Sequence, residues 1–182
     1  MGGSFNPAHQ GHIDISISAR KTAQLDEVWW LVSPQNPLKQ TEGMAIFSHR
    51  ICYARAFDLP NWIRVSDFEA SQHSVRTIDT LKRLRQIFKC CDLIWIMGAD
   101  NLIQLPEWQQ ARELMRMTNV MVMGRPGFNY QALASKGAAI AKRNLRTKNP
   151  AVLGKTRQGW YFEHFTHNSL SSTAIRKQTQ GL

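Results

Sequence analysis

Short apolar runs alternate along the chain with longer stretches in which apolar residues recur every three or four positions. The runs are rich in β-branched and aromatic residues, which is typical of strands buried on both faces; they lie at 28–32, 63–66, 93–97 and 120–123. The longer stretches have the period of amphipathic helices; they lie at 47–54, 78–88 and 105–115. This alternation predicts a doubly wound parallel sheet covered by helices, a three-layer α/β/α architecture.

The length of 182 residues suits one domain, and we expect residues 1–182 to form it. Open parallel sheets bind ligands beyond the carboxyl ends of their strands, so we expect the site residues in the loops that follow the strands. The stretch 128–159 is basic and lacks a clear period. We interpret it as a helix followed by a long loop.

Composition and charge limit the possible partners. Apolar residues make up 43% of the chain, and the formal net charge is +10. The apolar content excludes a disordered chain. The positive charge suggests an anionic partner: nucleic acid, membrane headgroups or a phosphorylated small molecule. The three cysteines have no zinc or redox spacing, and no apolar run is long enough to span a membrane or resembles a signal segment. We therefore expect a cytoplasmic protein with no membrane partner.

The first motif is the string GGSFNPAHQGH at residues 2–12. Gly2 and Gly3 allow a tight turn and a close approach of the backbone to a ligand. His9 and His12 stand where a helix begins, and free N–H groups at a helix start favour an anion. Together these features predict a phosphate-binding loop. A simple Gly-Pro turn with two surface histidines is the alternative, and the number of positions specified together disfavours it.

The second motif is SSTAIRK at residues 171–177. Serine and threonine favour the start of a helix, where their hydroxyl groups and the first amides bind anions. Arg176 and Lys177 add positive charge one turn later. Taken alone, the segment is more typical of an ordinary capped helix with a basic end. Taken with the first motif, it predicts a second anion site.

These strings carry a family resemblance. GGSFNPAHQGH resembles the HxGH loop of the nucleotidyltransferase superfamily, and SSTAIR resembles that superfamily's second motif, ISSTxIR. Three further strings are similar to those of the bacterial nicotinate-nucleotide adenylyltransferases; they are NPLK at 36–39, TIDTL at 77–81, and GADNL with PEW at 98–108. The resemblance implies a Rossmann-like fold and adenylyl transfer from ATP to nicotinate mononucleotide. It also implies Mg²⁺ carried by the ATP phosphates, no metal site of the protein's own, and no enzyme nucleophile.

The resemblance assigns roles residue by residue. The implied catalytic residues are His9, His12, Lys39 and Arg176, with His12 stabilising the α-phosphate and Lys39 reaching the reacting phosphates. The implied ATP-binding residues are Gly2, Gly3, Ser4, Phe5, His9, His12, Ser171, Ser172, Thr173 and Arg176. The implied residues for nicotinate mononucleotide are Asn6, Lys39, Arg50, Thr77, Asp100, Trp108 and Arg125. Thr77 would receive the carboxylate and Trp108 would stack on the pyridine ring. Two alternatives to these ligand roles stay open: simple packing of Trp108 in the core, and simple capping of a helix by Asp100.

One departure from the family pattern concerns the start of the sheet. Family members have an apolar strand running into the Gly-Gly turn, whereas only Met1 precedes Gly2 here. We therefore expect the first strand to be largely absent from this sequence.

Alternative functions remain. Another phosphate acceptor, such as phosphopantetheine or nicotinamide mononucleotide, is one. A basic nucleic-acid-binding module is another, although no RNA- or DNA-binding motif is present, so we expect no nucleic-acid partner. The oligomeric state is open, a homo-oligomer included.

Overall fold

The computed structural model describes residues 1–34, 43–72, 76–142, 145–153, 159–164, 172 and 175–176. The first half of the chain contains β1 (Gly2–Gly3), α1 (Gln10–Ala23), β2 (Val28–Val32), α2 (Phe47–Arg55), β3 (Ile63–Ser66), α3 (Phe68–Ser71) and α4 (Thr77–Ile87). The second half contains β4 (Ile94–Gly98), α5 (Ala99–Gln104), η1 (Leu105–Glu107), α6 (Ala111–Met117), β5 (Asn119–Met123), α7 (Asn129–Ala134), α8 (Lys136–Ala141), β6 (Leu145–Arg146), η2 (Pro150–Val152) and β7 (Gly159–Glu163). The predicted alternation of strands and helices is confirmed.

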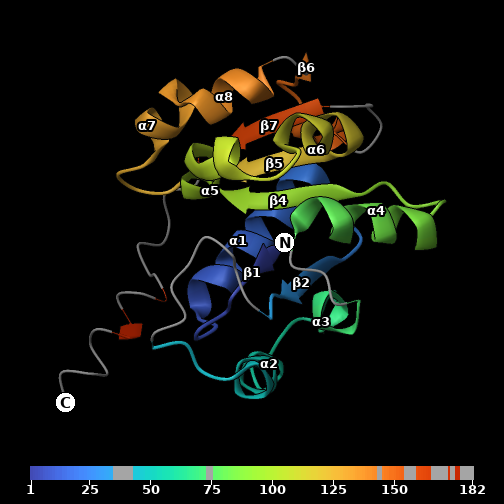
Figure 1. Ribbon diagram of the computed structural model, residues 1–182, viewed down its shortest axis with the longest axis vertical. Helices are drawn as coiled ribbons and strands as arrows, with labels where there is room; N and C mark the ends of the chain where they lie inside the picture. Colours follow the sequence, from blue (N-terminus) through green and yellow to red (C-terminus); the bar gives the residue numbers. More distant parts are fainter. Residues whose placement is uncertain are drawn as a thin grey trace.

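All the strand pairs are parallel, in the orders β1-β2-β3 and β4-β5-β7-β6. Strand β1 has two residues and pairs with β2, with Gly2 opposite Leu31 and Gly3 opposite Val32. The indole of Trp95 in β4 lies against Gly2, where an added Cβ would be 2.6 Å from the ring. Strand β1 therefore lies next to both groups of strands, and the N-terminus is drawn near the middle of the molecule (Figure 1).

Side chains of successive strand residues enter two separate cores, as the alternation of a pleated strand requires. One core takes Leu31, Trp95 and Val120 from the strands and packs them against α4, α5, α6 and α8. The other takes Trp30 and Met121 and packs them against α1 and α2. Each core contains residues from both groups of strands, so the strands form one layer between two layers of helices (Figure 1). The three-layer prediction is confirmed.

Two local expectations are wrong. Residues 105–115 do not form one helix: η1 ends at Glu107, Trp108 has extended backbone, and α6 begins at Ala111. The break lies at Trp108, whose backbone is extended, and at Gln110, whose backbone is left-handed. Pro106 stands in the first turn of η1, where a missing N–H is tolerated. The described residues of the stretch 128–159 form α7, α8, the two-residue strand β6 and the short 3-10 helix η2, rather than one helix and a loop, and β7 begins at Gly159.

Candidate active site

The first motif forms a loop between β1 and α1. The amide of Ser33, directly after β2, donates to the carbonyl of Gly3 over 2.8 Å and ties the loop to the carboxyl end of β2. Helix α1 then begins at Gln10, with His9 as its cap. The predicted position, a loop that follows a strand and opens a helix, is confirmed.

His9 and His12 cap the helix with their side chains. Nδ1 of His9 accepts from the amide of Gly11, and Nδ1 of His12 accepts from the amide of His9, both over 3.1 Å. A neutral imidazole that accepts at Nδ1 carries its proton at Nε2. Each ring therefore keeps one N–H donor on the side away from the helix backbone, which suits an anionic ligand.

Electrostatics also distinguish His9. Burial and the nearby positive charge of Arg125 lower the pKa of His9 below its ordinary value of 6.5, while the smaller effect of Asp14 acts in the opposite direction. The neutral tautomer just described is therefore the form that the folded protein favours at neutral pH.

Aromatic packing fixes the ring of His12. Phe5 is 1% exposed, has a left-handed φ of 45°, and lies 4.8 Å from the His12 ring and 5.1 Å from the Trp30 ring, measured between centroids. The indole N–H of Trp30 donates to Oγ of Ser16 over 2.8 Å, and that hydroxyl donates to the carbonyl of His12. The sequence pattern gives no sign of these contacts, because Trp30 and Ser16 lie within ordinary strand and helix patterns.

The second motif docks on the first. Oγ of Ser172 donates to the carbonyl of Pro7 over 3.0 Å, and the guanidinium of Arg176 donates to the carbonyl of Asn6. The partners are 165 and 170 residues apart in the sequence. The two predicted anion-binding motifs are thus brought together at one place.

The carboxyl ends of β4 and β5 add an ion pair. Asp100 Oδ2 lies 3.8 Å from Nη1 of Arg125, and each side chain is about one-third exposed, at 34% and 31%. A Cβ on Gly98 would lie 2.4 Å from Oδ1 of Asp100, so only glycine lets this carboxylate lie over the end of β4. The amide of Arg125 is held by Oδ1 of Asn129. Because Arg125 lowers the pKa of His9, the ion pair lies within electrostatic reach of the first motif.

Two of the predicted ligand residues have structural partners. Asn6 is 6% exposed, and its amide group accepts from the backbone of Ala45 and donates to that of Gly43. Arg50 is 2% exposed and donates to four backbone carbonyls. The resemblance implied that both side chains contact the mononucleotide. Their burial and their bonds to the backbone do not favour that contact. Both side chains instead hold the loop.

The remaining predicted residues are placed as follows. Thr77 is half-buried and is the first residue of α4, and Trp108 is half-buried against the core formed with α4 and α6. Glu69, which sequence analysis had passed over, is buried and accepts hydrogen bonds from Ser33 and Thr80, and burial raises its pKa. Lys39, Ser171 and Thr173 lie outside the described residues.

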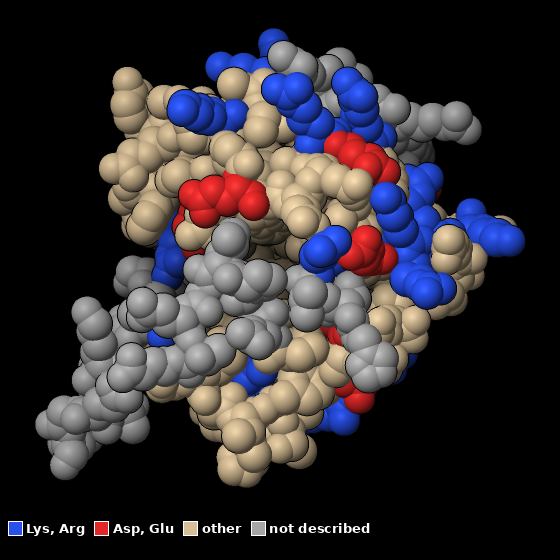
Figure 2. Space-filling view, in the orientation of Figure 1, with Lys and Arg blue, Asp and Glu red and all other residues tan. Residues whose placement is uncertain are grey.

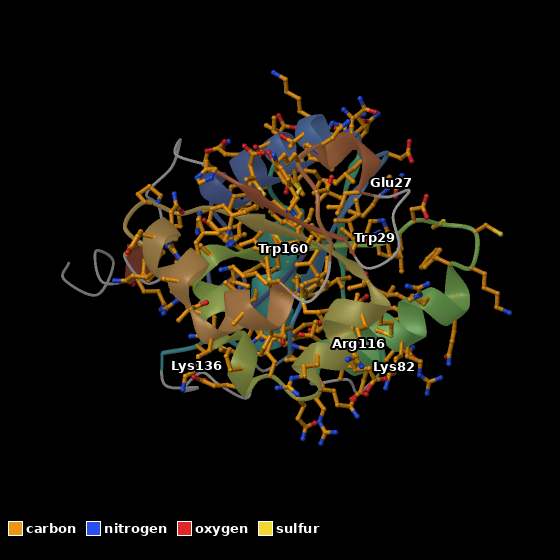
Figure 3. The ribbon with its side chains drawn as sticks, turned by 90° about the horizontal axis from the view of Figure 1, so that it is seen from above. Glu27, Trp29, Lys82, Arg116, Lys136 and Trp160 are labelled. Atoms are coloured by element: carbon orange, nitrogen blue, oxygen red, sulfur yellow. The ribbon has the colours of Figure 1, made fainter. Side chains whose placement is uncertain are left out.

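The basic side chains do not gather only at this site. Figure 2 shows Lys and Arg over α4, α6 and α8; the exposed or half-exposed ones there are Lys82, Arg83, Arg85, Arg112, Arg116, Lys136 and Lys142. Lys82 and Arg116 come from neighbouring helices (Figure 3), and Lys82 forms an ion pair with Glu113 at 2.9 Å. The second halves of α4 and α6 lead into the amino ends of β4 and β5, opposite the site.

Two features are absent from the part of the chain that the structure describes. None of its helices has the length and apolar character needed to cross a membrane. Across the same residues, no three His, Cys, Asp or Glu side chains are grouped as metal ligands.

Comparison with known proteins places the chain in a family. Residues 1–178 match the cytidylyltransferase-like family. The chain is 41% identical over 180 residues to a probable nicotinate-nucleotide adenylyltransferase of Parvibaculum lavamentivorans, which covers 98% of this chain and 90% of that protein. The chain belongs to the nicotinate-nucleotide adenylyltransferases.

Other relatives agree. A probable nicotinate-nucleotide adenylyltransferase of Erythrobacter litoralis is 41% identical over 184 residues, covering 97% of this chain and 82% of that protein. The nicotinic acid mononucleotide adenylyltransferase of Plasmodium falciparum complexed with NaAD has a similar fold, with a TM-score of 0.68 over 97% of this chain and 80% of its own. At 18% identity that structure supports the fold alone.

Proposed function

We propose that this chain transfers the adenylyl group of ATP to nicotinate mononucleotide, forming deamido-NAD and pyrophosphate. The observation that carries the proposal is the contact between the end motifs, in which Ser172 and Arg176 donate to the loop that precedes His9 and His12. Membership in the nicotinate-nucleotide adenylyltransferases supports the choice of substrates. We further propose that residues 1–182 act as one domain.

In this reaction an oxygen of the mononucleotide phosphate attacks the α-phosphorus of ATP. The bond from that phosphorus to the bridging oxygen breaks, and pyrophosphate leaves with the electron pair. No group on the enzyme becomes bonded to phosphorus, so catalysis rests on positioning and on stabilising charge. His12, with its proton at Nε2, would donate to an oxygen of the α-phosphate as negative charge builds there.

The ATP phosphates would lie over the first motif and under the second. The backbone of Gly2 to Phe5 and the donors of His9 would contact the nucleotide, while Ser171, Ser172, Thr173 and Arg176 would hold the β- and γ-phosphates. Mg²⁺ bound to these phosphates would neutralise part of their charge.

The mononucleotide would lie toward β4, β5 and α4. Arg125 is the described cation best placed for its phosphate, since it already acts electrostatically on His9. Asp100 orders Arg125 and is a partner for the ribose. The start of α4 at Thr77 would face the nicotinate carboxylate, with Trp108 against the ring and Lys39 near the reacting phosphates.

A direct assay tests the proposal. The purified chain is incubated with ATP, Mg²⁺ and one acceptor at a time: nicotinate mononucleotide, nicotinamide mononucleotide or phosphopantetheine. Release of pyrophosphate with nicotinate mononucleotide is the expected result. Pyrophosphate release with phosphopantetheine alone would show that the acceptor is phosphopantetheine and not nicotinate mononucleotide. No pyrophosphate release with any acceptor would contradict the proposed adenylyl transfer.

Partners and location complete the proposal. We expect no binding of duplex DNA or RNA at physiological salt, despite the basic surface on α4, α6 and α8, and a gel-shift assay with random sequences tests this. The cytoplasm is the proposed location, because Cys52, Cys90 and Cys91 are free and exposed, which suits a reducing compartment.

A further inference from the structure

Arg50 on α2 is a buried cation surrounded by backbone carbonyls. It is 2% exposed, and no carboxylate pairs with it in the described part of the chain. Its Nε donates to Ala45 O over 2.9 Å, and Nη2 donates to Pro34 O over 2.7 Å. Its Nη1 donates to Ser4 O over 2.6 Å and to Ser33 O over 2.8 Å. A buried guanidinium needs such partners, and its planar fork suits several acceptors at once.

These carbonyls belong to three segments that meet at the candidate site. Ser4 lies in the first motif, Ser33 and Pro34 directly follow β2, and Ala45 precedes α2. The Ser33 amide also donates to Gly3, and Asn6 bonds the backbone of Ala45. Arg50 is therefore the common partner that joins the ends of β1 and β2 to the segment before α2.

The bond to Ser4 has a consequence for the next residue. In a planar trans peptide the C=O and N–H point in opposite directions, so the Ser4 carbonyl held by Arg50 turns the Phe5 amide away from α2. Phe5 has a left-handed backbone that a bulky residue rarely adopts, so it needs such support. The Phe5 ring in turn lies 4.8 Å from the ring of His12. A continuous chain of contacts thus leads from Arg50 to the imidazole.

We propose that Arg50 is a positioning residue: it holds the loop of Ser4 and Phe5 so that His12 faces the reacting phosphate, and it does not bind substrate itself. The proposal rests on the proposed adenylyl transfer. It differs from a phosphate-binding role for Arg50 and from a role in stability alone, and the three possibilities predict different kinetics.

The test compares Arg50→Lys and Arg50→Met with Arg55→Lys as the matched control. Arg55 lies on the same helix but is exposed and paired with Asp67 at 3.7 Å. Lysine keeps the charge but cannot reach carbonyls of three segments at once. We expect Arg50→Lys to lower kcat by roughly ten- to one-hundredfold, the loss typical of a slightly misplaced reacting group. KM for both substrates should change by less than about threefold, and Arg55→Lys should match the unmodified protein.

Other outcomes overturn the proposal. A large rise in KM for nicotinate mononucleotide with kcat unchanged means that Arg50 binds the phosphate. A lower melting temperature with normal kcat in the folded protein means a role in stability alone. If Arg50→Met does not fold, Arg50→Lys decides, together with the ¹⁵N NMR signals of the His12 ring, which should shift in Arg50→Lys and stay unchanged if the loop is undisturbed. If the unmodified chain releases no pyrophosphate, the proposed function fails first, independently of any variant.

Discussion

Two substitutions of His12 should separate its structural role from its catalytic one. Its Nδ1 accepts from the His9 amide, whereas its Nε2 carries the donor proposed for the α-phosphate. Asparagine places an oxygen near the position of Nδ1 and has nothing at the position of Nε2. Glutamine reaches the Nε2 position with an N–H and leaves the Nδ1 position empty. Alanine removes both groups, so it cannot tell the two roles apart.

The magnitudes follow from the two contacts. Losing one donor that stabilises a charged transition state costs roughly one hundred- to one thousandfold in turnover. Losing one helix-capping bond costs about 0.5–2 kcal/mol of stability. His12→Asn should therefore lower kcat by about two orders of magnitude or more at a nearly unchanged melting temperature. His12→Gln should lose about 1 kcal/mol, or roughly 2–4 °C in a domain of this size, with a smaller loss of kcat.

The assay is steady-state release of pyrophosphate at saturating ATP and nicotinate mononucleotide, with thermal unfolding of each variant measured alongside. His12→Ala should show both losses together. Near-normal turnover in His12→Asn would remove His12 from the chemistry. Equal destabilisation by Asn and Ala would show instead that the capping bond to His9 contributes nothing.

Other predictions concern pH, the ion pair, salt and acceptor choice. The folded-state pKa of His9 is below 6.5, so the contribution of His9 to stability is complete above pH 6.5 and is lost as the pH falls below that value. The melting temperature should therefore fall as the pH is lowered from 7.5 to 5, and it should fall less in His9→Asn. Gly98→Ala should displace the Asp100 carboxylate from Arg125. Its kcat/KM should fall about as much as that of Asp100→Ala, and the variant with both substitutions should show no further loss of kcat/KM. Affinity for ATP, measured by calorimetry, should weaken as ionic strength rises, and a salt-independent Kd would contradict an electrostatic site. Nicotinate mononucleotide should be preferred over the nicotinamide form by about tenfold or more in kcat/KM, and Thr77→Val should narrow that gap.

The sequence predicted four strands well because each has a short run rich in apolar and β-branched residues, and β2, β4 and β5 are mostly buried. Strands β2 and β3 have the predicted bounds, β4 is shifted by one residue toward the C-terminus, and β5 begins one residue earlier than predicted. Strand β7, with Trp160 and Phe162 in the core, escaped prediction because it follows a basic stretch with no period. The break after η1 was missed for a different reason. The apolar residues from Leu105 to Met115 keep a helical spacing, and that spacing gives no sign of the extended backbone at Trp108 or the left-handed backbone at Gln110.

The site was predicted as a set of motifs, and its internal contacts were not. The position of His9 and His12 at a helix start follows from glycine, proline and helical periodicity in adjacent positions. The approach of Ser172 and Arg176 to that loop could be inferred from the resemblance, but not from periodicity, because it joins the two ends of the chain. The resemblance implied that Arg50 and Asn6 bind the mononucleotide, and that role stays a prediction. Nothing in the sequence indicated that both side chains also bond backbone groups, as they do in the structure.

Backbone groups and anionic ligands compete for the same side chains at this site. Loops that follow strands and open helices expose N–H and C=O groups that no regular ladder satisfies. Asn6, His9, His12 and Arg50 each make at least one bond to such a group, and Arg50 makes four. In each histidine this bond uses Nδ1, so the donor proposed for a ligand is the N–H on the other ring nitrogen. In a polar motif, therefore, the catalytic potential of a side chain depends less on its residue type than on which of its atoms already bond the backbone, and that depends on the fold.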